Sequence, residues 1–354
     1  MKRPVLVLLP CLAVLFVAGT PFVHLRLAGI GIDGLPPANE ARQGYDTLVR
    51  DFVGYGNTEM GVVAYFPTGR PTTGSGSAAV AELSRSLESI PGVVRVDAPI
   101  TGSHIALLTV VSNLDASSDG ARSIVSSIRA HNSVVGGGQV LVYGQTAGDI
   151  DVIAFIGSHI ILALGFVLAV TYLVLFLMTG SVVLPLKAVL TNLLSIAASF
   201  GALVWIFQQG HLSTQLGFTA QSIDPSVPVI LFALVFGLSM DYEVLLLARI
   251  QERWHCTGNN RLAVAEGLER SGRLITGAAA IMIGVFLAFG LADDVLIKSI
   301  GIGIAIAIAI DATLVRAFIV PAIMRLLGPW NWWAPHVLVR MHRKLGLHAA
   351  AAAA

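Results

Sequence analysis

Two aspartates, Asp241 and Asp311, stand inside long apolar segments of this sequence, where a charged side chain is costly. An ionised carboxylate at the centre of a membrane helix costs about 2.5 to 3.5 kcal/mol on insertion scales. Because burial disfavours the charged form of a carboxyl group, such an acid can take up and release a proton near neutral pH. The two positions therefore indicate a proton relay inside a membrane.

Neighbouring residues extend this candidate site. Tyr242 offers a hydroxyl that can donate to a carboxylate across a helix interface. Glu243 lies on a different helix face from Asp241 and nearer the inner surface, where solvation or pairing with a basic loop residue is the alternative to a relay role. For Asp311 the alternative is a structural ion pair with Arg316. The candidate relay comprises Asp241, Tyr242, Asp311 and Glu243.

Small residues precede both aspartates at helical spacing. Gly237 lies one turn before Asp241, and Gly303 and Ala307 lie two turns and one turn before Asp311. Small residues let membrane helices approach closely, so each acid is predicted to share a tightly packed helix face.

Other polar residues of the apolar segments have simpler explanations. Asn192, Ser195 and Ser199 fall at helical spacing, which favours interhelical hydrogen bonding over contact with a substrate. His159 lies near the outer end of its segment and is interpreted as interfacial, with a relay role as the alternative.

The sequence gives no sign of an enzyme. It contains no GxxxxGK[ST] phosphate loop, HExxH zinc motif or GxSxG nucleophile elbow. Its only cysteines, Cys11 and Cys256, indicate neither a disulfide framework nor a metal site. We therefore expect no enzymatic activity, no cofactor and no metal.

Composition places these residues in a lipid environment. The 354-residue chain is 55% hydrophobic and only 12% charged, with a mean hydropathy of +0.79. That is too much apolar surface for an ordinary soluble domain. The net charge of +1 gives no reason to expect a nucleic-acid partner.

Segments of roughly 20 apolar residues, the length that crosses the hydrocarbon core, occur six times. They are Pro4–Val23, Val152–Met178, Val182–Phe207, Ser226–Ala248, Leu274–Ala292 and Ser299–Pro321. The first could instead be a signal peptide, but it exceeds the usual apolar core of about 7 to 15 residues and ends in a poor cleavage site. We predict an α-helical multi-pass membrane protein with six spans.

Basic residues set the predicted orientation, because Lys and Arg favour cytoplasmic loops. The loop between the fourth and fifth spans and the C-terminal tail carry Arg249, Arg253, Arg261, Arg270, Arg273, Arg325, Arg340, Arg343 and Lys344. The opposite loops carry Asp224, Asp293 and Asp294 against Lys298. Both termini are therefore predicted to lie in the cytoplasm, and the protein is predicted to lie in the cell membrane.

Residues 24–151 then form an exterior insertion that is too long for a bare loop. After a helix at Ala41–Phe52, the pattern predicts strand, helix, strand, strand, helix and strand, which is the split βαβ, ferredoxin-like order. These elements are Met60–Phe66, Ala78–Ile90, Val93–Val96, His104–Val111, Gly120–Ala130 and Val140–Tyr143. Pro67–Ser77, rich in Gly, Pro, Ser and Thr, is predicted to be a mobile loop.

The run from Phe236 to Glu243, FGLSMDYE, closely resembles the fourth-helix signature of the MMPL family, within the resistance-nodulation-division (RND) superfamily. Agreement continues through Leu245–Ile250. Similar matches occur at Leu184–Lys187, Gly272–Thr276, Asp311–Arg316 and Asn331–Pro335. The last two resemble the final helix and exit of the family's second half, and Gly144–Ala147 resembles the entry to a second helix. The resemblance covers almost the whole chain except the alanine tail at 349–354.

The resemblance implies an RND-type bundle with an exterior porter domain between its first and second helices. The implied domains are a first helix at 1–23, the porter domain at 24–151, five helices at 152–327 and a cytoplasmic tail at 328–354. It further implies export of lipids or hydrophobic compounds driven by the proton gradient, with Asp241 and Tyr242 as the proton-translocating couple.

Family members have two such halves, whereas this chain has one. We therefore expect half of a transporter, whose partners are protons, a lipid or hydrophobic substrate, the membrane, and either a second half or another copy of itself. The alternatives are a lipid-sensing or assembly subunit that does not transport, and an inactive truncated remnant.

Overall fold

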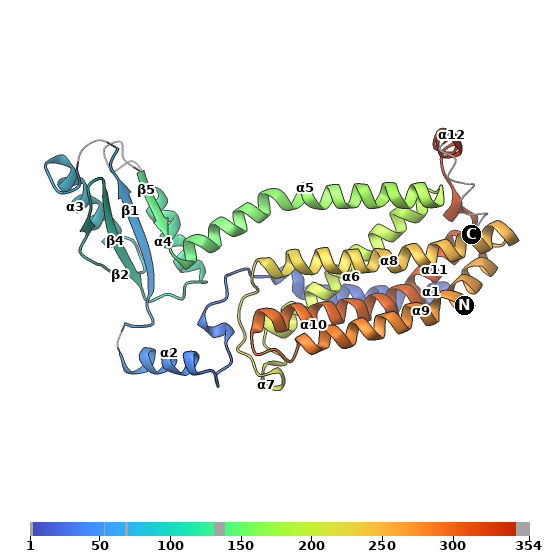
Figure 1. The fold of residues 1–354 in the computed structure, drawn as a ribbon, viewed down its shortest axis with the longest axis horizontal. Coiled ribbons are helices and arrows are strands. Elements are labelled where there is room, and N and C mark those ends of the chain that lie inside the picture. Colours follow the sequence, from blue (N-terminus) through green and yellow to red (C-terminus); the bar gives the residue numbers. More distant parts are fainter. Residues whose placement is uncertain (1–2, 53, 68–69, 131–138, 345–354) are drawn as a thin grey trace. The chain divides into compact units, whose positions relative to one another are not determined.

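The computed structural model describes residues 3–52, 54–67, 70–130 and 139–344 (Figure 1). The chain divides into two compact units. One contains the residues up to Arg26, Gly34–Pro36 and everything from His159 onward, and consists mainly of long apolar helices. The other contains Leu27–Asp33 and Pro37–Ser158 and is built around a β-sheet.

The sheet unit alternates strands and helices. Its elements are α2 (Glu40–Asp51), β1 (Thr58–Tyr65), α3 (Ser75–Glu88), β2 (Val93–Val96), β3 (Ile100–Thr101), β4 (Ile105–Ser112), α4 (Asp119–Ala130) and β5 (Gln139–Tyr143). The main strands lie in the order β2-β4-β1-β5 with every neighbouring pair antiparallel, and short β3 pairs with β4. The two longest strands, β1 and β4, therefore occupy the centre of the sheet.

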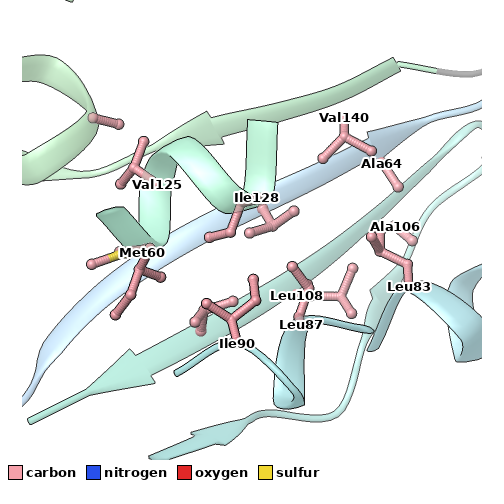
Figure 2. Close-up of a cluster of buried hydrophobic side chains, with 14 of the residues drawn as sticks. Met60, Ala64, Leu83, Leu87, Ile90, Ala106, Leu108, Val125, Ile128 and Val140 are labelled. Carbon is pink, nitrogen blue, oxygen red and sulfur yellow. The ribbon is translucent and has the colours of Figure 1, made fainter. Parts of the chain in front are cut away.

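The core of this unit lies between the sheet and the helices α3 and α4. Alternate residues of β1 and β4, including Met60 and Leu108, are buried because their side chains point to the same face of the sheet. Leu83 and Leu87 of α3 and Ile128 of α4 meet them there (Figure 2). Because one face of each helix is buried in this core, apolar residues recur at every third or fourth position of α3 and α4.

The strands lie close to their predicted positions, and β2 has the predicted bounds. The expected loop at Pro67–Ser77 is wrong at its C-terminal end, because α3 already begins at Ser75. Small polar residues such as serine are well tolerated in the first turn of a helix. Residues 68 and 69 of that loop lie outside the described residues.

The bundle unit contains long helices joined by short turns. Its elements are α1 (Pro4–Gly19), η1 (Thr20–His24), most of α5 (Gln145–Thr179), α6 (Val183–Leu203), η4 (Val204–Gln208), α7 (Ser213–Leu216), α8 (Ser226–Thr257), α9 (Asn260–Phe289), α10 (Val295–Ile310), η5 (Asp311–Ile319), α11 (Val320–Leu327), η6 (Gly328–Trp332) and α12 (His336–Lys344). Within the described residues, six helical stretches are long and apolar enough to cross a membrane. The chain is a multi-pass membrane protein, as predicted.

Several helices extend beyond their apolar segments. The fifth stretch begins at Asn260 rather than near Leu274, because the side chain of Asn259 caps it by accepting from the backbone N–H groups of Arg261 and Leu262. Polar residues can continue a helix beyond the hydrocarbon core, where water solvates them.

Helix α6 packs closely against α1. A Cβ atom added to Gly201 of α6 would lie 1.9 Å from the backbone oxygen of Ala18 in α1. Only glycine allows the two backbones to approach this closely. Helix α6 also contacts α8 and α10, so it holds one side of the polar cluster described next.

Candidate functional site

Four charged side chains meet inside the bundle. Lys187 comes from α6, Glu243 from α8, and Asp311 and Arg316 from η5, and all four are buried. They form a buried charge cluster with two acids and two bases, whose formal charges sum to zero.

The two acids bind the bases unequally. Arg316 holds Asp311 tightly, with Nε and Nη2 at 2.9 and 2.6 Å from Oδ2. Glu243 lies more loosely between the two bases, with Oε1 at 3.5 Å from Lys187 Nζ and Oε2 at 4.0 Å from Arg316 Nη1. Glu243 thus links the lysine of α6 to the ion pair of η5.

A π-helix brings Asp311 and Arg316 together. In an α-helix, residues five positions apart point about 140° away from each other. Segment η5 is instead a π-helix that begins at Asp311, and its wider i→i+5 turn places the two side chains on one side. Such segments are rare and occur frequently at functional sites.

Helix α8 completes the surroundings of Arg316. The guanidinium donates to the backbone oxygen of Ser239, and its Cζ lies 5.3 Å from the centre of the Tyr242 ring. A cation over an aromatic face is attracted by the ring's quadrupole. Tyr242 therefore touches the charge cluster directly while being the sequence neighbour of Asp241.

The cluster has unused hydrogen-bonding capacity. Four of its buried atoms lack a hydrogen-bond partner among the described residues: Lys187 Nζ, Glu243 Oε1, Asp311 Oδ1 and Arg316 Nη1. Unpaired polar atoms in a low-dielectric interior are costly, and a proton or small displacement can change which of them pair. The arrangement can thus exchange partners without a large movement of the backbone.

Asp241 lies elsewhere. It is exposed on the surface of the bundle unit and forms no ion pair or hydrogen bond with the described residues. The structure brings Glu243 and Asp311 together with Tyr242 beside them, but it does not bring Asp241 into the cluster. The predicted alternative for Asp311, an ion pair with Arg316, is present.

The expected packing of small residues holds for one acid only. A Cβ atom added to Gly303 would lie 2.4 Å from Leu231 and 2.7 Å from Leu203, both through leucine side chains. At Gly237, no atom of the described chain would lie within 4 Å. No described residue of this chain packs at Gly237, so a close helix approach beside Asp241 stays a prediction.

The predicted interhelical hydrogen bonding of the third span holds only in part. The amide of Asn192 lies 3.6 Å from the sulfur of Met240 in α8. Ser199 donates instead to the carbonyl oxygen of Ser195 in its own helix, as serines in helices often do.

Lys187 is the cluster residue that sequence reasoning missed. It is the only charged residue within its predicted span, and this was the available signal. Its position near the end of that span allowed a solvated side chain, and nothing local indicates that it turns toward Glu243.

Known proteins and a family model are similar to this chain over most of its length. The MMPL family model matches residues 37–350. The chain is similar to the heme uptake protein MmpL11 of Mycobacterium tuberculosis, with 37% identity over 96% of this chain and 36% of the relative. It is also similar to the mycolic acid-containing lipids exporter MmpL11 of Mycolicibacterium smegmatis, with 36% identity over 96% of this chain and 36% of the relative.

A third relative is the trehalose monomycolate exporter MmpL3 of Mycobacterium tuberculosis, with 34% identity over 98% of this chain and 38% of the relative. The chain therefore spans little more than a third of the length of the relatives that it matches. The family model covers the charge cluster and five of the six apolar spans, and the relatives match 96% to 98% of the chain. This chain belongs to the MMPL family.

Proposed function

We propose that the chain is one half of a proton-driven exporter of lipids or hydrophobic compounds, with Asp241 and Tyr242 as the proton couple. The observation that carries the proposal is the exposed carboxylate of Asp241. It lies fifteen residues after Ser226, where α8 begins, and within the predicted apolar span Ser226–Ala248. A charged group at that depth is costly in lipid, so another protein surface must cover it.

The rest of this helix face supports a protein neighbour. Ile230, Leu234 and Gly237 precede Asp241 at intervals of four, three and four residues, so they lie along one stripe of α8. All are exposed, and Gly237 leaves room for a second backbone to approach. We call Ile230, Leu234, Gly237 and Asp241 the open stripe.

A second six-helix half is the partner that fits this stripe. The relatives are nearly three times as long as the matched region, so their chains have room for such a half. A like half would bring its own membrane helices to the open stripe and enclose Asp241 away from lipid. Such an assembly would have approximate two-fold symmetry about the membrane normal, as in parallel-repeat transporters.

Tyr242 gives the proposed couple a route to the interior. Its neighbour Asp241 faces the partner half, whereas its ring lies against Arg316 of the charge cluster. A change in the charge of Asp241 would alter the field at Tyr242 and at the cluster, where Glu243 and Asp311 compete for the same guanidinium. The cluster would then change its pairing with each transport cycle.

The sheet unit serves as the exterior porter domain in this proposal. Its strands lie in the order β2-β4-β1-β5 with antiparallel neighbours, and one helix follows β1 and another follows β4. This arrangement supports the split βαβ, ferredoxin-like class. Because Lys and Arg favour cytoplasmic loops, we propose that the termini lie in the cytoplasm and this unit outside the cell membrane.

The relatives' names set the breadth of the proposed cargo. Two are named for exporting mycolic acid-containing lipids or trehalose monomycolate, and one for heme uptake. The shared chemistry is a large molecule with an extensive apolar surface, and we propose a lipid of this kind as the cargo.

The decisive experiment neutralises Asp241 in the assembled complex. Vesicles that contain the chain and its partner half would be given a pH gradient, and lipid export would be followed with a fluorescent long-chain lipid. Asp241→Asn preserves shape but removes titration, so we expect export to be lost while membrane insertion and abundance stay normal.

Asp293→Asn is the matched control, because Asp293 is an exposed acid in a loop of the same unit. It should leave export unchanged. Normal gradient-dependent export by Asp241→Asn would reject this residue as the proton carrier and favour the lipid-sensing or assembly role.

A further inference from the structure

The last helix, α12, turns two apolar side chains away from the bundle. Val337 and Met341 are 70% and 54% exposed and lie one turn apart. Arg340 is exposed between them. A helix with an apolar stripe next to basic side chains is typical of segments that lie in the membrane interface.

Contacts on the opposite side of α12 hold it against the end of α5. His342 is buried, and its Nε2 lies 2.8 Å from the carbonyl oxygen of Leu177. Its ring meets Phe176 edge-on at 6.0 Å. Because α5 ends at Thr179, these contacts hold α12 beside the end of a membrane span (Figure 1). Val337 and Met341 are therefore exposed beside the end of an apolar helix that is long enough to cross a membrane.

The turn before α12 is anchored equally well. The side-chain amide of Asn331 is buried and donates to the carbonyl oxygens of Met324 and Gly328, at 2.6 and 2.7 Å. Ser181 donates to the backbone oxygen of Asn331 at 2.5 Å. Trp330 and Trp333 flank this anchor, with their exposed rings 6.2 Å apart. Tryptophan is enriched at membrane interfaces, where its ring can lie between headgroups and chains.

The charge of this segment indicates which lipids it would bind. The residues from Arg325 to Lys344 contain four basic residues, Arg325, Arg340, Arg343 and Lys344, and no acid. Anionic lipid headgroups attract such segments, whereas zwitterionic lipids do so weakly.

We propose that α12, Trp330 and Trp333 form a docking surface for anionic lipids. The basic side chains bind the lipid headgroups, and Val337 and Met341 insert among the lipids. The nine-residue helix is too short to be stable alone in water, and the anchors through His342 and Asn331 hold it in place before lipid binds. An anionic lipid surface would then clamp the end of α5 to η6 from outside the bundle.

The test uses the full chain reconstituted in lipid vesicles. In a Cys11→Ser and Cys256→Ser background, Met341→Cys carries an environment-sensitive fluorophore. The matched control keeps native Cys256, which is exposed at the end of α8, and carries the same label there. In vesicles with phosphatidylglycerol, we expect blue-shifted emission and quenching by spin-labelled lipid at position 341 but not at position 256.

Replacing Arg340, Arg343 and Lys344 by glutamine should weaken this docking by about fivefold for each charge, or about a hundredfold together. Thermal stability of the variant confirms that the bundle is intact. Two outcomes would overturn the proposal. In one, the label at position 341 is quenched by aqueous iodide as strongly as that at position 256. In the other, its emission is the same with neutral lipid as with anionic lipid, which would assign the stripe to a protein partner or to lipid chains alone.

Discussion

Removing Lys187 should destabilise the bundle by leaving an acid buried without its base. In Lys187→Met the cluster keeps two carboxylates and one guanidinium. Arg316 is already committed to Asp311 at 2.6 Å and lies 4.0 Å from Glu243. Breaking a buried ion pair by removing one partner costs about 3 to 5 kcal/mol, and we expect a loss of unfolding free energy in that range.

The double variant Lys187→Met with Glu243→Met tests the reason for this loss. It removes one acid and one base, so the tight pair of Asp311 and Arg316 remains with no net charge. Replacing a whole buried ion pair by apolar side chains of similar volume is often neutral or stabilising. The double variant should therefore regain most of the stability that either single variant loses.

Reversible unfolding in mixed detergent micelles with added dodecyl sulfate, followed by helical circular dichroism, gives the four free energies of this cycle. Lys298→Met is the matched control. Lys298 is also buried, but it donates to the backbone oxygen of Leu216 and forms no ion pair with the described residues. Its loss should cost about 1 to 3 kcal/mol, and Glu243→Met should not relieve it.

A double variant that loses as much stability as the two single variants combined would refute the reasoning. It would show that Lys187 and Glu243 do not interact energetically, despite the 3.5 Å between them. In that case the lysine would act through packing alone.

Four further outcomes are expected. A membrane-impermeant thiol reagent on intact cells should miss Cys256 and label Ser75→Cys; the reverse pattern would invert the topology. Gly201→Ala should destabilise the bundle by about 3 kcal/mol in the same unfolding assay, because its methyl group would overlap the α1 backbone, while Gly237→Ala should not weaken the isolated chain. Tyr242→Phe should impair export less completely than the loss of Asp241, as initial export rates would show. Membrane cross-linking should recover the chain in a complex, and full export by a monomer would contradict the half-transporter proposal.

The sequence by itself determined where the membrane helices and the strands lie. Lipid leaves no alternative to a helix for an apolar run of about 20 residues, so the six spans follow from composition and length. The strands of the other unit follow from β-branched residues bounded by turns, as at Val93–Val96. Both signals lie within short segments of the sequence, so neighbouring residues are enough to determine these elements.

Only the tertiary structure decided which acids meet. Asp241 and Glu243 are two residues apart on one helix, and whether each is covered depends on neighbours that come from distant parts of the chain. Lys187 reaches Glu243 across 56 positions, and the π-helix that turns Arg316 onto Asp311 has no sequence signature among these residues. Sequence periodicity gives the direction in which a side chain points around its helix. The packing of other helices determines which of these directions faces the interior.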